Sequence, residues 1–127
     1  MKRILVIDDS ETNLVLLKAI LEDAGFYVNL AGNSKEATAL YEKDKPDLIL
    51  LDLLMPGVDG FGFLSMMNKE EKGKVVTPVI VVTAYANDEN KDRAKKLGAA
   101  DVIEKPIDIP AFLFKINQVL DSKIYKD

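Results

Sequence analysis

The sequence predicts an α/β fold in which helices cover both faces of a doubly wound parallel sheet. Short apolar runs alternate with segments of helical period from one end of the chain to the other, as in repeated strand–helix units. The runs are nearly continuous, as expected of strands that are buried on both faces. A length of 127 residues suits one domain, so we expect a single domain over residues 1–127.

Five apolar runs are predicted to be the strands. They are Ile4–Ile7, Phe26–Leu30, Leu48–Leu51, Val79–Val82 and the weaker run Ala99–Ile103. Because a helical segment separates each run from the next, the strands are expected to be parallel.

Five helices are predicted, one after each strand. The first carries apolar residues at helical spacing, and Gly25 is expected to close it. The second is expected to begin at Ser34 as the capping residue, with Glu36 near its positive end. The apolar positions that mark the first, third and fifth helices are Leu14, Leu17, Ile20, Leu21, Ala24, then Phe61, Leu64, Met67, then Ile109, Phe112, Leu113, Ile116, Val119 and Leu120.

The last two helices have clearer ends. Gly98 follows the fourth helix, Asn87–Leu97, and Asp108 precedes the fifth, which has Pro110 in its first turn. The segment Ala86–Leu97, which contains the fourth helix, reads ANDENKDRAKKL, and so little apolar surface predicts weak packing. Phe114 lies about opposite the apolar stripe of the fifth helix, so we expect it to be exposed, either as a partner surface or as an isolated apolar residue.

The residue types exclude several kinds of chemistry. The chain has neither Cys nor His, which excludes disulfides, thiolate catalysis, imidazole acid–base catalysis and metal sites built from those side chains. Its 17 basic and 21 acidic residues give a net charge of −4, which argues against a broad nucleic-acid interface. The N-terminal apolar run is too short for a signal peptide, and no run approaches the length of a membrane span. We expect a cytoplasmic protein.

Polar side chains follow the ends of four predicted strands. Asp8 and Asp9 end the first strand, Asp52 the third, Thr83 the fourth and Lys105 the fifth. Ligands of an open parallel sheet bind at the carboxyl ends of its strands, so we expect these side chains at one edge. Taken singly, each has a structural explanation as a helix cap or a surface charge; the conjunction of all five favours a binding site.

The chemistry of these side chains indicates a metal and a phosphoryl group. Three carboxylates in one place repel one another, and Mg²⁺, with Mn²⁺ as the alternative, suits an all-oxygen set. A Lys and a hydroxyl facing the same point would stabilise a transferred phosphoryl group. The turn dipeptides Pro56-Gly57 and Asp59-Gly60 indicate a shaped loop. Pro106 follows Lys105, where a cis bond would orient the lysine.

The motifs VIDDS, LLDLLMPGVDG, VVTA and EKP span the chain in this order. With them the chain resembles the receiver domain of response regulators in two-component signalling. The resemblance implies a flavodoxin-like (βα)5 fold with strand order 2-1-3-4-5. It also implies a phosphoacceptor module that takes a phosphoryl group from a phosphohistidine. Because this chain has no His, that histidine would belong to a partner, either a sensor histidine kinase or a histidine phosphotransfer protein. The module would then regulate an effector.

The same resemblance implies a role for each site residue. Asp52 would be the phosphoacceptor, and it would bind Mg²⁺ with Asp9 and the backbone carbonyl of Leu54. Asp8 would act on the metal largely through water. The groups that would contact the phosphoryl oxygens are Lys105, Thr83 and the backbone amides of Leu54 and Ala84.

Three positions depart from the usual pattern of the family. Val102 stands three residues before Lys105, where an aromatic ring usually reports phosphorylation, so we expect output through the loop after the fourth strand and the fourth helix. Leu54 and Tyr85 occupy positions that commonly tune the lifetime of the phosphoryl group. Neither is an acid or an amide that would position water, and we predict slow autodephosphorylation.

Other functions stay open at this stage. A receiver-shaped interaction module not regulated by phosphorylation is disfavoured by the intact set of five polar residues. A phosphohydrolase of the haloacid dehalogenase type needs D-x-D after the first strand, whereas Asp8 and Asp9 are adjacent. An FMN carrier would need a loop rich in Ser, Thr and Gly after the first strand to bind the phosphate. The segment at that place reads DDSETN and is acidic, which disfavours this function. We expect either a protein that acts through a partner or the receiver of a longer regulator or hybrid kinase.

Overall fold

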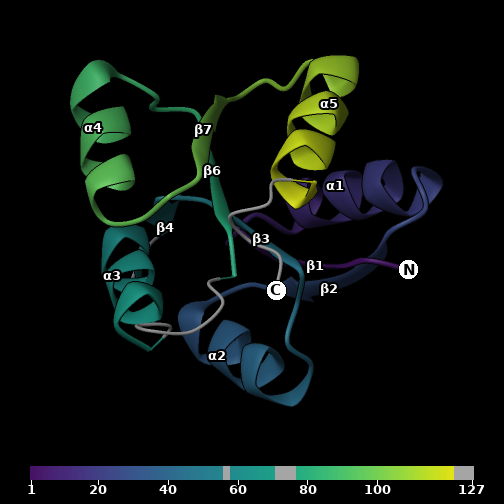
Figure 1. Ribbon diagram of the computed structural model, residues 1–127, viewed down its shortest axis with the longest axis horizontal. Coiled ribbons are helices and arrows are strands. Elements are labelled where there is room, and N and C mark those ends of the chain that lie inside the picture. Colours follow the sequence, from purple (N-terminus) through teal and green to yellow (C-terminus); the bar gives the residue numbers. More distant parts are fainter. Residues whose placement is uncertain (56–57, 71–76, 122–127) are drawn as a thin grey trace.

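Strands and helices alternate along the chain as predicted. A computed structural model describes residues 1–55, 58–70 and 77–121 (Figure 1). Its strands are β1 (Arg3–Ile7), β2 (Tyr27–Ala31), β3 (Leu48–Leu51), β4 (Leu54–Met55), β5 (Val58–Asp59), β6 (Val79–Thr83) and β7 (Asp101–Glu104). Its helices are α1 (Glu11–Asp23), α2 (Ser34–Lys43), α3 (Gly60–Glu70), α4 (Asp88–Lys96) and α5 (Ile109–Leu120). All five predicted strands and all five predicted helices are confirmed.

Five strands form one parallel sheet in the order β2-β1-β3-β6-β7. Numbered along the chain, these strands have the order 2-1-3-4-5, which confirms the flavodoxin-like fold. β4 and β5 pair with each other in antiparallel fashion directly after β3. The sequence pattern did not predict this hairpin, because two-residue strands are too short to show a period.

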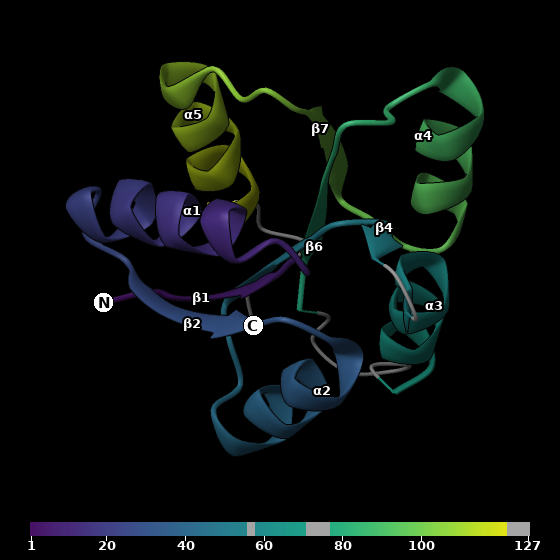
Figure 2. The same ribbon diagram turned by 180° about the vertical axis from the view of Figure 1, so that it is seen from behind.

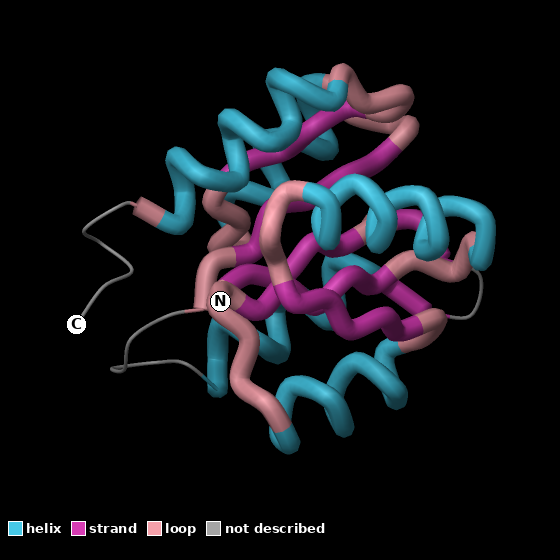
Figure 3. Tube along the Cα trace, turned by 90° about the vertical axis from the view of Figure 1, so that its right-hand side faces the viewer, coloured by secondary structure: helices cyan, strands magenta, loops and turns pink. Residues whose placement is uncertain are grey.

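Helices cover both faces of the sheet. α1 and α5 lie on one face, and α2, α3 and α4 lie on the other (Figures 1 and 2), with the strands between the two layers (Figure 3). Along β1, Ile4 and Val6 pack in the core under α1 and α5, whereas Leu5 and Ile7 pack in the core on the other face. Burial on both faces explains why the strands are apolar throughout.

The start of α2 differs from the prediction in its capping residue. The helix begins at Ser34, but the residue that caps it is Asn33, whose side chain accepts a hydrogen bond from the backbone N–H of Glu36. Glu36 in turn accepts a hydrogen bond from the N–H of Gly32 at 2.8 Å. Asn is at least as good a cap as Ser, so the helix is capped one residue earlier than expected.

The ends of α1, α4 and α5 are as predicted. Gly25 and Gly98 follow α1 and α4 with φ of 95° and 107°, a left-handed conformation that glycine adopts at low cost. Asp108 caps α5. Phe114 is exposed as predicted, and Ile109, the first residue of α5, is also exposed.

α4 packs on its neighbours through little apolar surface, which fits the expectation of weak packing. Ala94 is its buried residue. The guanidinium of Arg93 lies 4.0 Å from the centre of the Phe61 ring in α3, a cation–π contact of modest strength. Among the parts of the chain that are described, no helix has the length and apolar character needed to cross a membrane.

Candidate functional site

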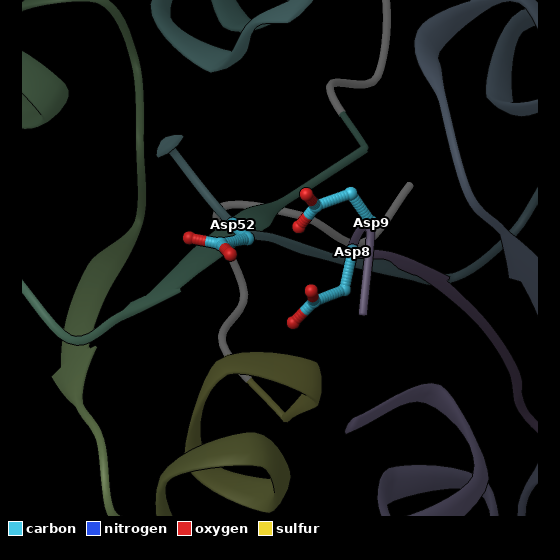
Figure 4. Close-up of side chains that lie close together, drawn as sticks. All are labelled: Asp8, Asp9 and Asp52. Atoms are coloured by element: carbon cyan, nitrogen blue, oxygen red, sulfur yellow. The ribbon is translucent and has the colours of Figure 1, made fainter. Parts of the chain in front are cut away.

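The register of the sheet brings Asp8 and Asp52 to the same edge. Ile7 pairs with Leu51 at the carboxyl ends of β1 and β3, and the N–H of Asp52 donates to the carbonyl of Ile7 at 3.0 Å. The residue after each of these strand ends is therefore an Asp. Figure 4 shows the side chains of Asp8 and Asp9, from the end of β1, near that of Asp52, from the end of β3.

Asp8, Asp9 and Asp52 form an acidic cluster. One carboxylate oxygen from each residue lies within 4.8 Å of those from the other two. Asp8 and Asp52 are buried, and Asp9 is exposed. Burying two carboxylates side by side is unfavourable unless positive charge or hydrogen-bond donors compensate them. The cluster therefore requires compensating groups nearby.

Lys105 supplies positive charge to this cluster. Its Nζ lies 2.8 Å from Oδ2 of Asp8 and 3.4 Å from Oδ2 of Asp52. The residue follows β7, its backbone N–H donates to the carbonyl of Thr83 at 2.8 Å, and the bond between Lys105 and Pro106 is cis. Four of the five predicted site residues, from three strand ends, thus meet at one place.

Asp8 is also held by the beginning of α1. The N–H of Ser10 donates to its Oδ1 at 2.9 Å, and the side-chain amide of Asn13 donates to its Oδ2 at 3.4 Å. The first turn of α1 thus adds donors to the carboxylate, which is 2% exposed. Sequence reasoning missed Asn13; its place in the first turn of the helix that follows the Asp pair was the available signal.

Thr83 ends β6 at the same edge. The residue is fully buried, and its Oγ1 accepts a hydrogen bond from the N–H of Tyr85 at 3.1 Å. The carbonyl of Tyr85 accepts one from the side chain of Asn90, in the first turn of α4, at 2.8 Å. Ala84 and Tyr85 are exposed. A chain of hydrogen bonds therefore runs from the edge of the sheet to α4.

The segment after Asp52 is less completely described. Leu54 begins β4 and pairs with Asp59, and the role of its carbonyl and amide stays a prediction. The predicted turn at Pro56-Gly57 lies outside the described residues. Val102 pairs with Val81 in the sheet and packs against the core under α2, α3 and α4.

An apolar pocket opens beside Lys105. Its volume is about 410 Å³. It lies where α1 faces the segment between β7 and α5, and its wall combines Leu16 and Ile20 of α1 with Pro106, Ile107 and Ile109. Lys105 contributes to this wall as well as to the acidic cluster, so the pocket and the cluster are adjacent.

Comparison with known proteins finds similarity along nearly the whole chain. A model of the family described as the response regulator receiver domain matches residues 4–117. Protein PilH of Pseudomonas aeruginosa is 39% identical over 120 residues, which cover 94% of this chain and 98% of PilH.

Two solved structures are also similar. A CheY-like response regulator receiver domain protein from Methanospirillum hungatei has a TM-score of 0.86 at 35% identity, covering 95% of this chain and 94% of that one. The non-phosphorylated HemR receiver domain from Leptospira biflexa has a TM-score of 0.87 at 34% identity, covering 97% of both chains. The similarity thus extends to sequence and fold together.

Proposed function

This chain belongs to the response regulator receiver domain family, and we propose that it accepts a phosphoryl group on Asp52 from a phosphohistidine of a partner protein. Receiver domains are phosphoacceptor signalling modules rather than turnover enzymes, and they interact with kinases or phosphotransfer proteins and with effectors. The observation that carries the proposal is the acidic cluster around Asp52 with Lys105 against it.

In the proposed step, a carboxylate oxygen of Asp52 attacks the phosphorus of the phosphohistidine. The new P–O bond forms as the P–N bond breaks, and the leaving imidazole nitrogen keeps the electron pair and takes up a proton. The product is an acyl phosphate on Asp52 and a neutral histidine on the partner. Because a carboxylate is a weak nucleophile, the surrounding residues contribute by positioning and by charge.

The acidic cluster fits a hard divalent cation, Mg²⁺ or Mn²⁺. It offers oxygen donors within 4.8 Å of one another, and opposed ligands of an octahedral Mg²⁺ are about 4.2 Å apart. Receiver domains generally bind Mg²⁺ at such a cluster. Here Asp9, Asp52 and the carbonyl of Leu54 are the proposed direct ligands. Three protein donors already occupy Asp8, which supports contact through water. A bound ion would neutralise charge between carboxylates and phosphoryl oxygens.

Lys105 is proposed to pair with the phosphoryl group once it is in place. Its contact with Asp52 at 3.4 Å is longer than its contact with Asp8 at 2.8 Å. The longer contact is the weaker one, so it is the one to be exchanged for a phosphoryl oxygen. Lys105 would keep its bond to Asp8 and would thus hold the phosphoryl group against the acidic cluster.

Thr83 and two backbone amides are proposed to complete the phosphoryl pocket. A hydroxyl can donate one hydrogen bond while it accepts another. Thr83 can therefore donate to the phosphoryl group and still accept from the N–H of Tyr85. The amides of Leu54 and Ala84 are the other proposed donors.

Loss of the phosphoryl group to water is proposed to be slow. Hydrolysis needs a water molecule aligned with the P–O bond, and neither Leu54 nor Tyr85 carries a carboxylate or an amide that would orient one. We expect the phosphorylated protein to decay over minutes or longer in Mg²⁺, measured by intact mass after removal of the phosphodonor. A half-life of seconds would contradict this expectation.

The proposed partner in the transfer is a sensor histidine kinase or a histidine phosphotransfer protein. A donor whose histidine reaches Asp52 would cover the rim of the site. The apolar pocket beside Lys105 would receive its apolar side chains. Residues 1–127 are proposed to act as one receiver domain in the cytoplasm, with output through an effector protein and without direct contact to nucleic acid or membrane.

The proposed function is tested by incubation with acetyl phosphate and Mg²⁺, followed by intact mass measurement. The wild type should gain one phosphoryl group, and chelation of the metal should prevent the gain. Asp52→Asn should gain none. Asp101→Asn, which removes a carboxylate from β7, should behave as the wild type does. Modification that persists in Asp52→Asn would refute the assignment of the phosphoacceptor.

A further inference from the structure

Gly60, the first residue of α3, lies directly against the backbone that carries Asp52. A Cβ atom at this position would lie 2.6 Å from Cα and 2.7 Å from the carbonyl oxygen of Leu53, and 2.8 Å from the carbonyl oxygen of Asp52. Non-bonded carbon atoms normally stay about 3.5–4.0 Å apart. A methyl group therefore cannot enter unless the backbone moves by roughly an ångström.

The requirement for glycine at this position is one of space. The positive φ angles found in the described residues belong to Gly25 and Gly98, so the backbone of Gly60 is one that any residue can adopt. All three atoms in the way are main-chain atoms, which cannot rotate aside as a side chain would. Leu53 is itself buried, which limits its movement away from α3.

Gly32 offers a contrast at the same edge of the sheet. It follows β2 and precedes α2, much as Gly60 follows the β4–β5 hairpin and precedes α3. A Cβ atom at Gly32 would meet the side-chain Oε1 of Glu36 at 3.4 Å. That atom lies at the end of a flexible side chain, so an alanine fits at Gly32 and does not fit at Gly60.

Hydrogen bonds connect Gly60 to the segment that follows the phosphoacceptor. The N–H of Gly60 donates to the carbonyl of Leu53 at 3.2 Å, and Leu54 pairs with Asp59 in the small hairpin. The first residue of α3 therefore lies directly against the backbone of Asp52 and Leu53, and the residue before it pairs with Leu54. Leu54 is also the residue whose carbonyl is a proposed metal ligand.

We infer that Gly60 is a positioning residue for the site: its lack of a side chain lets α3 hold the Asp52–Leu54 backbone where the Asp52 carboxylate and the Leu54 carbonyl reach the same metal ion. The inference rests on the proposed function. Gly60 touches neither metal nor phosphoryl group; it acts through the backbone of Leu53. A displacement of about an ångström at a reacting group can cost about a hundredfold in rate, so the close approach matters for chemistry as well as for packing.

The test is the Mg²⁺ concentration at which phosphorylation by acetyl phosphate is half-maximal. Gly60→Ala should raise it by about tenfold or more, and calorimetric titration should show the same loss in Mg²⁺ affinity. The matched control Gly32→Ala should leave both values within about twofold of the wild type, because its methyl group meets a side chain that can move. A folded Gly60→Ala protein with wild-type Mg²⁺ affinity would overturn the inference.

A second measurement uses the wild type, so it tests the positioning role of Gly60 even if Gly60→Ala does not fold. In an NMR titration, the amide resonances of Leu53 and Gly60 should shift with the same Mg²⁺ midpoint as that of Asp9, while that of Gly32 should shift less. A Gly60 amide that is indifferent to Mg²⁺ would overturn the inference. Failure of the wild type to be phosphorylated at Asp52 would instead refute the proposed function, so the two failures are distinguishable.

Discussion

Lys105 contacts two buried carboxylates, so its contribution to the stability of the fold can be separated from its proposed role in signalling. Without a metal, its ammonium group compensates Asp8 and Asp52. Removal of one partner from a buried ion pair leaves an uncompensated charge, which typically costs about 3 kcal/mol. A bound divalent cation would supply the same compensation. The stability of the fold and the occupancy of the metal site are therefore coupled through this residue.

Lys105→Ala should be less stable than the wild type by about 3 kcal/mol in the presence of a chelator, and Mg²⁺ should restore much of that loss. Because an ion that binds only the folded state stabilises in proportion to its affinity, this restoration requires the variant to bind Mg²⁺ more tightly than the wild type does, while its structural response to phosphorylation should be weaker. Urea unfolding with and without Mg²⁺ measures the first two effects. Lys96→Ala is the control, since Lys96 and Asp92 form an exposed pair at 4.0 Å of small worth. Equal destabilisation in both metal states would contradict the prediction.

At the scale of secondary structure, β7 is tied to α5 by a charged pair. The Nζ of Lys115 lies 2.9 Å from Oδ2 of Asp101. Burial alone would raise the pKa of the Asp101 carboxyl, but hydrogen bonds from Lys115 and from the N–H of Val102, with the charges of Lys115 and Lys95, hold that pKa below its ordinary value of 3.8. The ionised carboxylate is thus favoured in the folded state.

This lowered pKa gives the pair a defined pH dependence. The folded-state pKa lies below that of the unfolded chain, so the carboxylate stabilises the fold above the unfolded value. That contribution is lost as the pH falls through the folded value. Asp101→Asn should lower the free energy of unfolding by about 0.5 kcal/mol at neutral pH and by progressively less in acid. Urea unfolding of both proteins over this range measures the difference, and a difference that grows in acid would contradict the assignment.

α4 is connected to the site by hydrogen bonds, whereas its apolar packing is slight. The chain runs from Thr83 to the backbone of Tyr85 and from there to the side chain of Asn90. Val102 stands where an aromatic residue is usual in the family. Among the described residues, these hydrogen bonds therefore offer a route by which a movement of Thr83 would reach α4. Weakly packed segments open at low free energy, which would suit the proposed output through a shift of α4.

Asn90→Ala should uncouple α4 from the site without affecting the chemistry. Phosphorylation of Asp52 by acetyl phosphate should proceed as in the wild type, but amide hydrogen exchange in α4 should change less on phosphorylation. The control is Asn117→Ala, which removes a similar bond from a side-chain amide to a backbone carbonyl, that of Leu113, within α5. An α4 response in Asn90→Ala equal to that of the wild type would show that the connection is not used.

At the scale of the whole molecule, the features that repeat along the chain could be predicted from the sequence. The sheet and its helix layers follow from the alternation of apolar runs and helical periods. The convergence of Asp8, Asp52 and Lys105 follows from the rule that parallel strands end at one edge. These residues were predictable because each lies directly after a strand, and their contacts in the structure agree with that expectation.

The remaining features depend on contacts between segments with no period of their own. The donation from Asn13 to Asp8 depends on the angle at which α1 leaves β1. The close approach of Gly60 to Leu53 depends on where the hairpin ends and α3 begins. The capping of α2 by Asn33 instead of Ser34 is a choice between two adjacent residues of similar propensity. Pattern and propensity do not contain such three-dimensional information.

The location of the acyl phosphate tests the central claim most directly. Borohydride reduces an aspartyl phosphate to homoserine, which peptide mass spectrometry can place in the sequence after treatment with acetyl phosphate and Mg²⁺. Homoserine should be found at position 52 and should be absent when the metal is chelated. Homoserine in place of Asp8 or Asp9, or a phosphorylated protein with none at position 52, would contradict Asp52 as the phosphoacceptor.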